Sequence, residues 1–386
     1  TLAPGAVFVA YRPRARPARS CYNFHVRPAN DRPFGVAIAG AGVIASSHAR
    51  AVAGLPNARL RAVTDVAAEA AQRRAAEFGV DAYTDLGELL RRPDIDVVSV
   101  CVPSGLHAEV GAQAAEAGKH VIVEKPIDVS LEAADRLIAT CRRRGVKLAV
   151  ISQHRFDPGI QAMRAALDAG RFGRLVLGDV IVKWYRTGAY YGSAGWRGTW
   201  KLDGGGALMN QGIHWVDVLQ WMMGPVDRVV ARCSMIAHDI PVEDVALALL
   251  TFRSGALGTI EVSTAVYPGL PERIEITGTG GTAVVEMGEV VVWEFKDEKG
   301  EVGPYGAKVR TVHRAEAATA PDQAASQIAG HRTQIGDFLQ AIADDRDPVI
   351  TGEEARKPLE IILAVYESAR TGREVALPLS RAGQQR

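Results

Sequence analysis

The sequence lacks long apolar runs, a cysteine framework and an excess of charge of either sign. No uninterrupted apolar stretch is long enough to cross a bilayer, so we expect no membrane partner. The formal net charge of the 386 residues is only +1, which gives no reason to expect nucleic acid as a partner. Cys21, Cys101, Cys141 and Cys233 are scattered without metal-ligand spacing. They predict free thiols in a reducing, cytoplasmic setting and no metal site.

The bulk composition is that of a globular protein with two domains. Apolar residues make up 47% and charged residues 23% of the chain, and its length exceeds that of one ordinary core. Residues 1–33 are rich in arginine and proline and contain a single acid, Asp31. This composition would also suit a targeting segment, but it has no proper apolar core. We therefore expect residues 1–33 to be a flexible extension outside the fold.

A glycine-rich turn near the start of the first domain predicts a dinucleotide site. The apolar run 34–39 leads directly into Gly40-Ala41-Gly42-Val43-Ile44-Ala45, and an alanine-rich helical pattern follows. Strand, turn and helix form the context in which a G-x-G-x-x-A motif binds pyrophosphate. The first glycine permits the tight turn, the second admits the phosphate, and the helix N-terminus faces the anion. The expected cofactor-binding residues here are Gly40, Gly42, Val43 and Ile44.

The next strands add further candidates for the cofactor. A predicted strand, 60–64, ends at Asp65, where a carboxylate can accept hydrogen bonds from ribose hydroxyls and would repel a ribose phosphate. NAD is therefore favoured over NADP. A largely apolar strand, 96–102, opens into a loop that contains Ser104 and His107. Open parallel sheets bind ligands at this edge, so we expect both residues to lie near the cofactor, although a lone histidine is more often a packing residue.

The order of the predicted elements indicates two fold classes in one chain. Strands and helices alternate to residue 151, which predicts a doubly wound parallel sheet, a Rossmann domain over 34–154. Beyond it, long strand-like runs dominate and predict a second, α+β domain over 155–386 with a large open, mostly antiparallel sheet. These runs are 175–185, 226–238, 245–252, 256–264 and 273–277. Because such a sheet needs a cover on its second face, we expect a homodimer or homotetramer formed through it.

Two segments carry candidates for the chemistry. Glu124-Lys125-Pro126 closes the apolar run 121–123 and offers an amine at the end of a buried strand. With the glycine turn, it suggests a nicotinamide enzyme whose lysine handles a substrate hydroxyl proton. The second segment is a helix predicted over 207–223, which follows three glycines. Its polar stripe (Asn210, His214, Asp217 and Trp221) either faces a cleft or is a solvated face.

Taken together, these motifs resemble the glucose–fructose oxidoreductase / inositol dehydrogenase / MocA (Gfo/Idh/MocA) family of sugar and cyclitol dehydrogenases. The resemblance covers nearly all of 34–379 and includes the segment 204–217 and a tail from His331 to Gly372. It implies a cis Lys125–Pro126 bond. It also implies that Lys125 and His214 act at the hydride-transfer centre and that Glu124 contacts the nicotinamide ribose.

One position departs from the family pattern. Many relatives have aspartate where this chain has Asn210, one helical turn before His214. An asparagine can orient the histidine by hydrogen bonding but cannot stabilise an imidazolium by charge. Proton acceptance would then depend more on Lys125, or on Asp217 from the other side.

The resemblance implies NAD-dependent oxidation of a secondary ring hydroxyl of a pyranoside, sugar derivative or cyclitol to the keto-sugar. Besides Lys125, Asn210 and His214, we expect Arg186, Trp196 and Arg197 to contact the substrate. The two arginines would hold a carboxylate or phosphate, or else be surface charges. Two alternatives stay open, namely an enzyme with a closed redox cycle and tightly bound NAD, such as a sugar epimerase, glycosidase or sugar–sugar oxidoreductase, and a non-catalytic NAD-responsive sensor.

Overall fold

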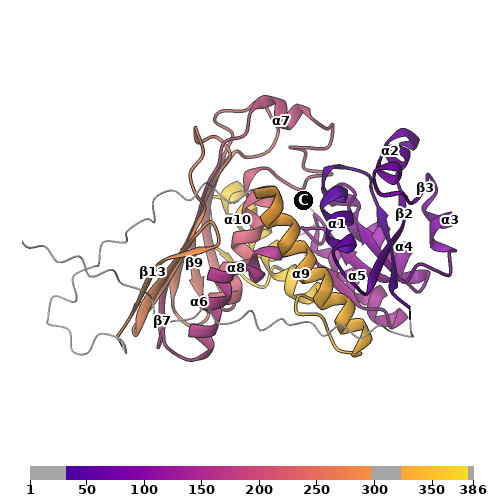
Figure 1. Cartoon of the computed structure of the whole chain (residues 1–386). Helices are drawn as coiled ribbons and strands as arrows, with labels where there is room; N and C mark the ends of the chain where they lie inside the picture. Colours follow the sequence, from indigo (N-terminus) through magenta and orange to yellow (C-terminus); the bar gives the residue numbers. More distant parts are fainter. Residues whose placement is uncertain (1–31, 297–322, 381–386) are drawn as a thin grey trace, which may run out of the picture.

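The computed structural model describes residues 32–296 and 323–380, which form two sheets with helices between and around them (Figure 1). The segment 1–33, expected to be a flexible extension, lies almost wholly outside the described residues. No helix within 32–296 and 323–380 is long and apolar enough to cross a membrane.

The first sheet is six-stranded and parallel, with strand order β3-β2-β1-β4-β5-β6, which confirms the predicted doubly wound domain. Its central strands are buried on both faces, as expected for their continuous apolar sequence. The strands are β1 (Phe34–Ala39), β2 (Ala58–Thr64), β3 (Asp81–Tyr83), β4 (Val97–Val100), β5 (His120–Val123) and β6 (Leu148–Val150). The helices are α1 (Val43–Ala53), α2 (Ala68–Phe78), α3 (Leu86–Leu90), α4 (His107–Glu116) and α5 (Leu131–Arg144), with the 3₁₀ turns η2 (Ser104–Leu106) and η3 (Gln153–Phe156).

The second sheet is eight-stranded, with order β13-β12-β11-β7-β10-β9-β8-β14. Among the described strands of this sheet, only β7 and β10 pair in parallel, so the expectation of a mostly antiparallel sheet is confirmed. The strands are β7 (Leu175–Lys183), β8 (Val226–Ser234), β9 (Val245–Phe252), β10 (Leu257–Ser263), β11 (Arg273–Gly278), β12 (Gly281–Glu286), β13 (Glu289–Phe295) and β14 (Val375–Ala376). The helices of this half are α6 (Pro158–Asp168), α7 (Gly188–Gly192), the π-helix η4 (Ala207–Gly212), α8 (Ile213–Met223), α9 (Gln323–Ala343) and α10 (Gly352–Thr371).

Two of the expected elements differ from the structure, one at its end and one at its start. The strand expected over 226–238 ends at Ser234, because the N–H groups of residues 236–238 bind the Asp244 carboxylate and not a neighbouring strand. The helix expected over 207–223 begins as the π-helix η4 and becomes α-helical only at Ile213.

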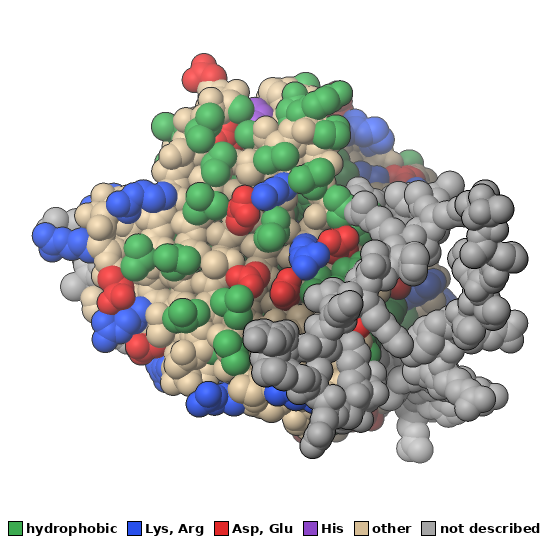
Figure 2. All heavy atoms as spheres, turned by 90° about the vertical axis from the view of Figure 1, so that its left-hand side faces the viewer, with side chains coloured by type: hydrophobic (Ala, Val, Ile, Leu, Met, Phe, Trp, Pro, Cys, Tyr) green, Lys and Arg blue, Asp and Glu red, His purple; other side chains and the backbone are tan. Residues whose placement is uncertain are grey.

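The two faces of the second sheet differ. Helices α6, α8 and α10 cover one face and bury its alternate side chains in the main core. The other face has no helix over it among the described residues, and apolar side chains are exposed there among a few charged ones (Figure 2). Leu247 and Leu249 of β9 and Leu257 of β10 are on this outer face.

Helix α9 packs on the first domain although it follows the second sheet in the chain. Ile335, Phe338 and Leu339 share a core with residues of β1 and α1. This packing places the start of α9 beside the carboxyl ends of the first sheet, where the candidate site lies (Figure 1).

Candidate functional site

A cavity of about 1410 Å³ opens at the carboxyl ends of the parallel strands and extends to the second sheet. All of the expected cofactor and substrate residues line it: Gly40, Gly42, Val43, Ile44, Asp65, Ser104, His107, Glu124, Lys125, Arg186, Trp196, Arg197, Asn210 and His214. Of the expected catalytic residues, only Asp217 does not line this cavity. The expected cofactor-binding residues and all of the expected catalytic residues but Asp217 therefore line one continuous cavity.

The glycine turn has the geometry that a pyrophosphate requires. Gly40 has φ of +101°, and a Cβ there would lie 2.5 Å from the Cys101 carbonyl oxygen, so only glycine fits. A Cβ at Gly42 would meet nothing within 4 Å, which leaves open space at the N-terminus of α1. Asp65 braces this turn by accepting a hydrogen bond from the Ala41 N–H (2.7 Å). These residues fit a dinucleotide.

His107 links the loop after β4 to the segment after Lys125. Its Nδ1 lies 2.6 Å from the Pro126 carbonyl oxygen and its Nε2 lies 2.9 Å from the Val102 carbonyl oxygen. Ser104 begins the neighbouring 3₁₀ turn and is buried at the cavity wall. His107 therefore holds two parts of the wall together.

Glu124, directly after β5, is a buried carboxylate bound by two histidines. Its Oε1 atom lies 2.9 Å from His48 Nε2 and 3.0 Å from His331 Nε2. Its Oε2 atom accepts a hydrogen bond from the Lys125 N–H (3.1 Å). Burial opposes ionisation, but the hydrogen bonds from His331 and His48 outweigh it and hold the pKa of Glu124 well below its usual range.

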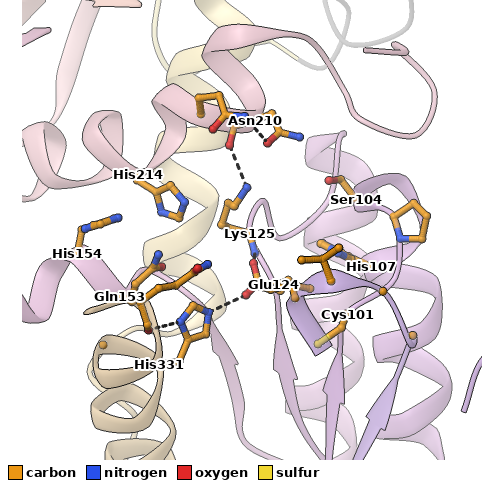
Figure 3. Close-up of a pocket in the computed structure, with 18 of the residues that line it drawn as sticks. Cys101, Ser104, His107, Glu124, Lys125, Gln153, His154, Asn210, His214 and His331 are labelled. Atoms are coloured by element: carbon orange, nitrogen blue, oxygen red, sulfur yellow. Dashed lines mark hydrogen bonds and ion pairs between the residues drawn. The ribbon is translucent and has the colours of Figure 1, made fainter. Parts of the chain in front are cut away.

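Lys125 is partly buried and its amine extends towards the second domain (Figure 3). Its Nζ donates a hydrogen bond to the Asn210 backbone carbonyl oxygen (2.9 Å), and the Lys125–Pro126 peptide bond is cis, as expected. Burial lowers the pKa of Lys125, and Arg197 acts in the same direction, while Glu124 and Asp203 oppose them. A lysine in such surroundings loses its proton more readily than one in water.

The π-helix η4 presents the Asn210 carbonyl to Lys125. The Glu243 carboxylate holds the start of η4 by accepting hydrogen bonds from Gly206 N (2.9 Å) and Leu208 N (2.8 Å). A Cβ at residue 206 would lie 1.8 Å from the Glu243 carbonyl oxygen, which explains the last of the three glycines. π-helical turns are frequent at functional sites because they redirect side chains and carbonyls.

His214, on α8, points into the same cavity as Lys125 (Figure 3). Burial, reinforced by Lys125 and His154, holds the pKa of His214 well below its usual range, so its imidazole is neutral near pH 7. Its Nδ1 is buried and has no hydrogen-bond partner among the described residues. The His154 ring meets it edge to face at 5.1 Å between centroids.

Asn210 does not orient His214 in the structure. Its Nδ2 donates to the Asp203 carboxylate, and its Oδ1 accepts a hydrogen bond from Gln211 Nε2 (3.3 Å). Asp203 also accepts from the Gly198 N–H (2.8 Å), and burial raises its pKa. The side chain of Asn210 therefore connects its helix to the loop that precedes the glycines.

Asp217 forms a buried ion pair away from the cavity. Its carboxylate accepts hydrogen bonds from Arg155 Nη2 (2.6 Å) and Nε (2.7 Å) and from the Ser152 hydroxyl. Trp221 lies over the same guanidinium, with its ring centroid 5.1 Å from Cζ. The polar stripe of the helix therefore divides into two parts. Asn210 and His214 line the cavity, whereas Asp217 and Trp221 contact Arg155.

Two arginines line the substrate side of the cavity without a carboxylate partner among the described residues. Arg186 lies over the Trp184 and Tyr190 rings, and Arg197 lies over Tyr190 and Trp196. The Nε atom of Arg197 is buried and has no acceptor in the described part of the chain. Lys201, by contrast, is exposed and does not line the cavity.

Several residues of the site were not among the sequence candidates. Their positions depend on contacts between distant segments, and only two had a local signal: Asp203 directly precedes the three glycines, and His331 begins the tail of the family resemblance. The additional residues are Gln153, His154, Asp203, Glu272 and His331; all but Asp203 line the cavity, and Asp203 binds Asn210 at its wall.

The fold and the site define a two-domain, nicotinamide-dependent oxidoreductase. Comparison with known proteins supports the same class of enzyme. An oxidoreductase family with an NAD-binding Rossmann fold matches residues 34–152, and the GFO/IDH/MocA C-terminal domain matches residues 160–284. The chain belongs to the Gfo/Idh/MocA family.

Relatives match this chain over most of its length. The crystal structure of the WlbA dehydrogenase from Bordetella pertussis, in complex with NADH and UDP-GlcNAcA, is 32% identical with a TM-score of 0.80, and the match covers 92% of this chain and 100% of that chain. Myo-inositol 2-dehydrogenase of Thermotoga maritima is 27% identical over 360 residues, 89% of this chain and 98% of the relative. D-glucoside 3-dehydrogenase of Escherichia coli is 27% identical over 366 residues, again 89% and 98%. The expectations of an enzyme and of NAD as its cofactor are confirmed.

Proposed function

We propose that this enzyme oxidises a secondary ring hydroxyl of a sugar derivative with NAD, and that the sugar carries an anionic group such as a carboxylate or a phosphate. The observation that carries the proposal is the position of the Lys125 amine, which lies in the same cavity as the glycine turn, His214 and two arginines without carboxylate partners. The WlbA complex with a nucleotide-linked uronic acid supports an anionic substrate.

The proton chemistry follows from the surroundings of two bases. Loss of hydride from carbon requires removal of the hydroxyl proton as the C–H bond weakens, and NAD supplies the hydride acceptor when it is bound. Burial lowers the pKa of both Lys125 and His214, which favours in each the neutral form that can accept that proton. Lys125 Nζ accepts it directly, or it stabilises the alkoxide while His214 accepts it.

The arginines and aromatic side chains would orient the substrate. Arg186 and Arg197 can form charge-assisted hydrogen bonds to a carboxylate or phosphate. Tyr185 and Trp196 also line the cavity and offer apolar faces for sugar C–H groups, whereas Trp200 and Tyr190 do not line it. A substrate without an anion would leave both guanidinium groups in the cavity without an anionic partner from the substrate.

Absorbance of the reduced nicotinamide near 340 nm tests the proposal directly. Purified protein with NAD would be mixed with matched neutral and anionic substrates: methyl glucoside, a glucuronide, a sugar phosphate, a nucleotide-linked uronic acid and myo-inositol. Growth of the band with the anionic sugars is the expected result. Growth with neutral sugars alone would overturn the choice of substrate. No growth with any of them, together with NADH released on denaturation, would instead support a closed redox cycle.

We propose further that the enzyme is a cytoplasmic homo-oligomer joined through the outer face of the second sheet. The exposed apolar side chains of β8, β9 and β10 form a surface that a second copy of the chain would cover (Figure 2). The described thiols, Cys101, Cys141 and Cys233, are free, in keeping with a reducing compartment.

A further inference from the structure

The contacts of His331 determine where its ring protons are. His331 Nδ1 lies 2.8 Å from the Gln327 backbone carbonyl oxygen, which can only accept a hydrogen bond, so Nδ1 carries a proton. A neutral imidazole has one N–H group, which would leave Nε2 as a lone pair. That lone pair would face a carboxylate oxygen of Glu124 at 3.0 Å, and two acceptors do not approach so closely without a proton between them.

The second histidine of the cluster needs no additional proton. His48 Nδ1 lies 2.6 Å from the Ser99 hydroxyl, which can donate as well as accept. A neutral His48 therefore satisfies both of its contacts, accepting from Ser99 at Nδ1 and donating to Glu124 from Nε2. Burial lowers the pKa of His48 and favours this neutral form.

We propose that His331 is an imidazolium paired with the Glu124 carboxylate, and that this buried ion pair fixes the glutamate for the cofactor. Two N–H donors, His48 and His331, occupy Oε1, so the carboxylate cannot rotate without breaking both bonds. Oε2, which accepts only the Lys125 N–H among the described residues, stays available to a ribose hydroxyl. This step rests on the proposed function with NAD, and on the contact between Glu124 and the nicotinamide ribose that the family resemblance implies.

His331 is thus a positioning residue that acts through Glu124. It comes from α9, 207 positions away in the chain, and is buried with only 1% of its surface exposed. Its helix packs against α1, which carries both His48 and the glycine turn at its N-terminus. The ion pair therefore ties the tail of the chain to the cofactor end of the first domain.

A metal ion is the other cation that such a cluster can hold, since His48, Glu124 and His331 offer three ligand atoms. Ligands about 2.1 Å from a tetrahedral ion lie roughly 3.4 Å from one another. The separations of 2.9 and 3.0 Å to the shared oxygen are instead those of hydrogen bonds. The geometry therefore favours a proton.

Nitrogen NMR of histidine-labelled protein at pH 7.5 tests the protonation state, because imidazolium and neutral rings have distinct ¹⁵N shifts. The chain has nine histidines, and His331→Gln assigns the relevant signal. We expect both nitrogens of His331 to be protonated in the wild type and only Nδ1 in Glu124→Gln. A neutral His331 in the wild type would overturn the proposal, as would one equivalent of tightly bound metal. Glu124→Gln still tests the pair through the loss of an imidazolium signal if His331→Gln does not fold.

Calorimetric titration with NAD tests the positioning role. Glu124→Gln and His331→Gln should each weaken NAD binding, and the double variant should bind about 10-fold more tightly than the product of the single effects implies. The control is His120→Gln, because His120 of β5 is half-buried, lies outside the cavity and contacts the Lys147 N–H. It should bind NAD as the wild type does. Additive effects would overturn the coupling, and unchanged NAD binding in both single variants would overturn the positioning role. Failure of the proposed function would instead appear as absent NADH formation by a wild type that still binds NAD.

Discussion

Lys125 Nζ lies 2.9 Å from the Asn210 backbone carbonyl oxygen, a contact that joins the end of β5 to the π-helix η4. A carbonyl oxygen accepts a hydrogen bond from a lysine amine whether the amine is charged or neutral. The amine can therefore gain and lose a proton without leaving its position. A residue that keeps its place through a proton transfer suits general acid–base catalysis.

Replacing Lys125 with methionine should remove catalysis and spare cofactor binding. Methionine approximates the length of the side chain but has no basic nitrogen, so kcat should fall by about 10²- to 10⁴-fold, the usual contribution of a positioned base. The rate of NADH formation at saturating substrate gives kcat. Calorimetry gives the Kd for NAD, which should stay near the wild-type value. Wild-type turnover in Lys125→Met would refute the role of the amine.

The pH dependence of oxidation should reflect the lowered pKa of Lys125. A base must be neutral to accept a proton, so kcat/KM should be low in acid and should rise as Lys125 loses its proton. Because burial lowers this pKa from its ordinary value of 10.5, the plateau should be reached at a lower pH than for an exposed lysine. Profiles of kcat/KM against pH at saturating NAD measure this rise. Lys125→Arg, which stays charged, should lose the pH-dependent rise. An unchanged rise in that variant would assign it to another group.

Asp217→Asn should act on stability and not on the proton chemistry. Removing one partner of a buried ion pair costs about 3–5 kcal/mol, and Arg155 would keep only its longer contact with Glu354 (3.4 Å). Thermal unfolding should show this loss, while the folded fraction keeps its kcat. The matched control, Asp227→Asn, breaks an exposed pair with Arg228 and should change stability by less than about 1 kcal/mol. Normal stability with lost turnover would instead make Asp217 a proton acceptor.

The parts of the site that were predictable from the sequence are those that depend on local patterns. The glycine turn follows a strand and opens a helix, and Glu124 and Lys125 directly follow an apolar strand, so neighbours in the chain determined their structural context. Family resemblance then added the roles of these residues.

The remaining features depend on residues far apart in the chain. The π-helix η4 forms where Glu243, 37 positions beyond Gly206, binds its first N–H groups, and no periodicity within 207–223 reveals that partner. Asp217 is bound by Arg155, 62 positions earlier, so its helical spacing from His214 did not indicate which surface it faces. Long-range packing overrode the pattern in both places.

Arg197 should determine preference for anionic substrates. Arg197→Ala removes charge-assisted hydrogen bonds from the cavity and should raise KM for an anionic sugar by about 10- to 100-fold. Neutral sugars should show a much smaller change, because they do not use the charge. Lys201→Ala is the control, since this lysine lies nearby in the chain but is exposed outside the cavity. Equal losses for neutral and anionic sugars would mean that Arg197 only supports the aromatic rings around it.

Leu249→Glu should dissociate the proposed oligomer. Leu249 has 63% of its surface exposed on the outer face, and it lies opposite Val230 of β8 and Thr259 of β10. A carboxylate buried there between two sheets would be desolvated without a partner, which costs more than a small interface can supply. Light scattering after size exclusion should therefore give a dimer or tetramer for the wild type and a monomer for the variant. Val349→Glu, a partly exposed valine away from this sheet, should leave the mass unchanged. A monomeric wild type would overturn the proposed oligomer. A variant that keeps the full mass would mean that the interface lies elsewhere.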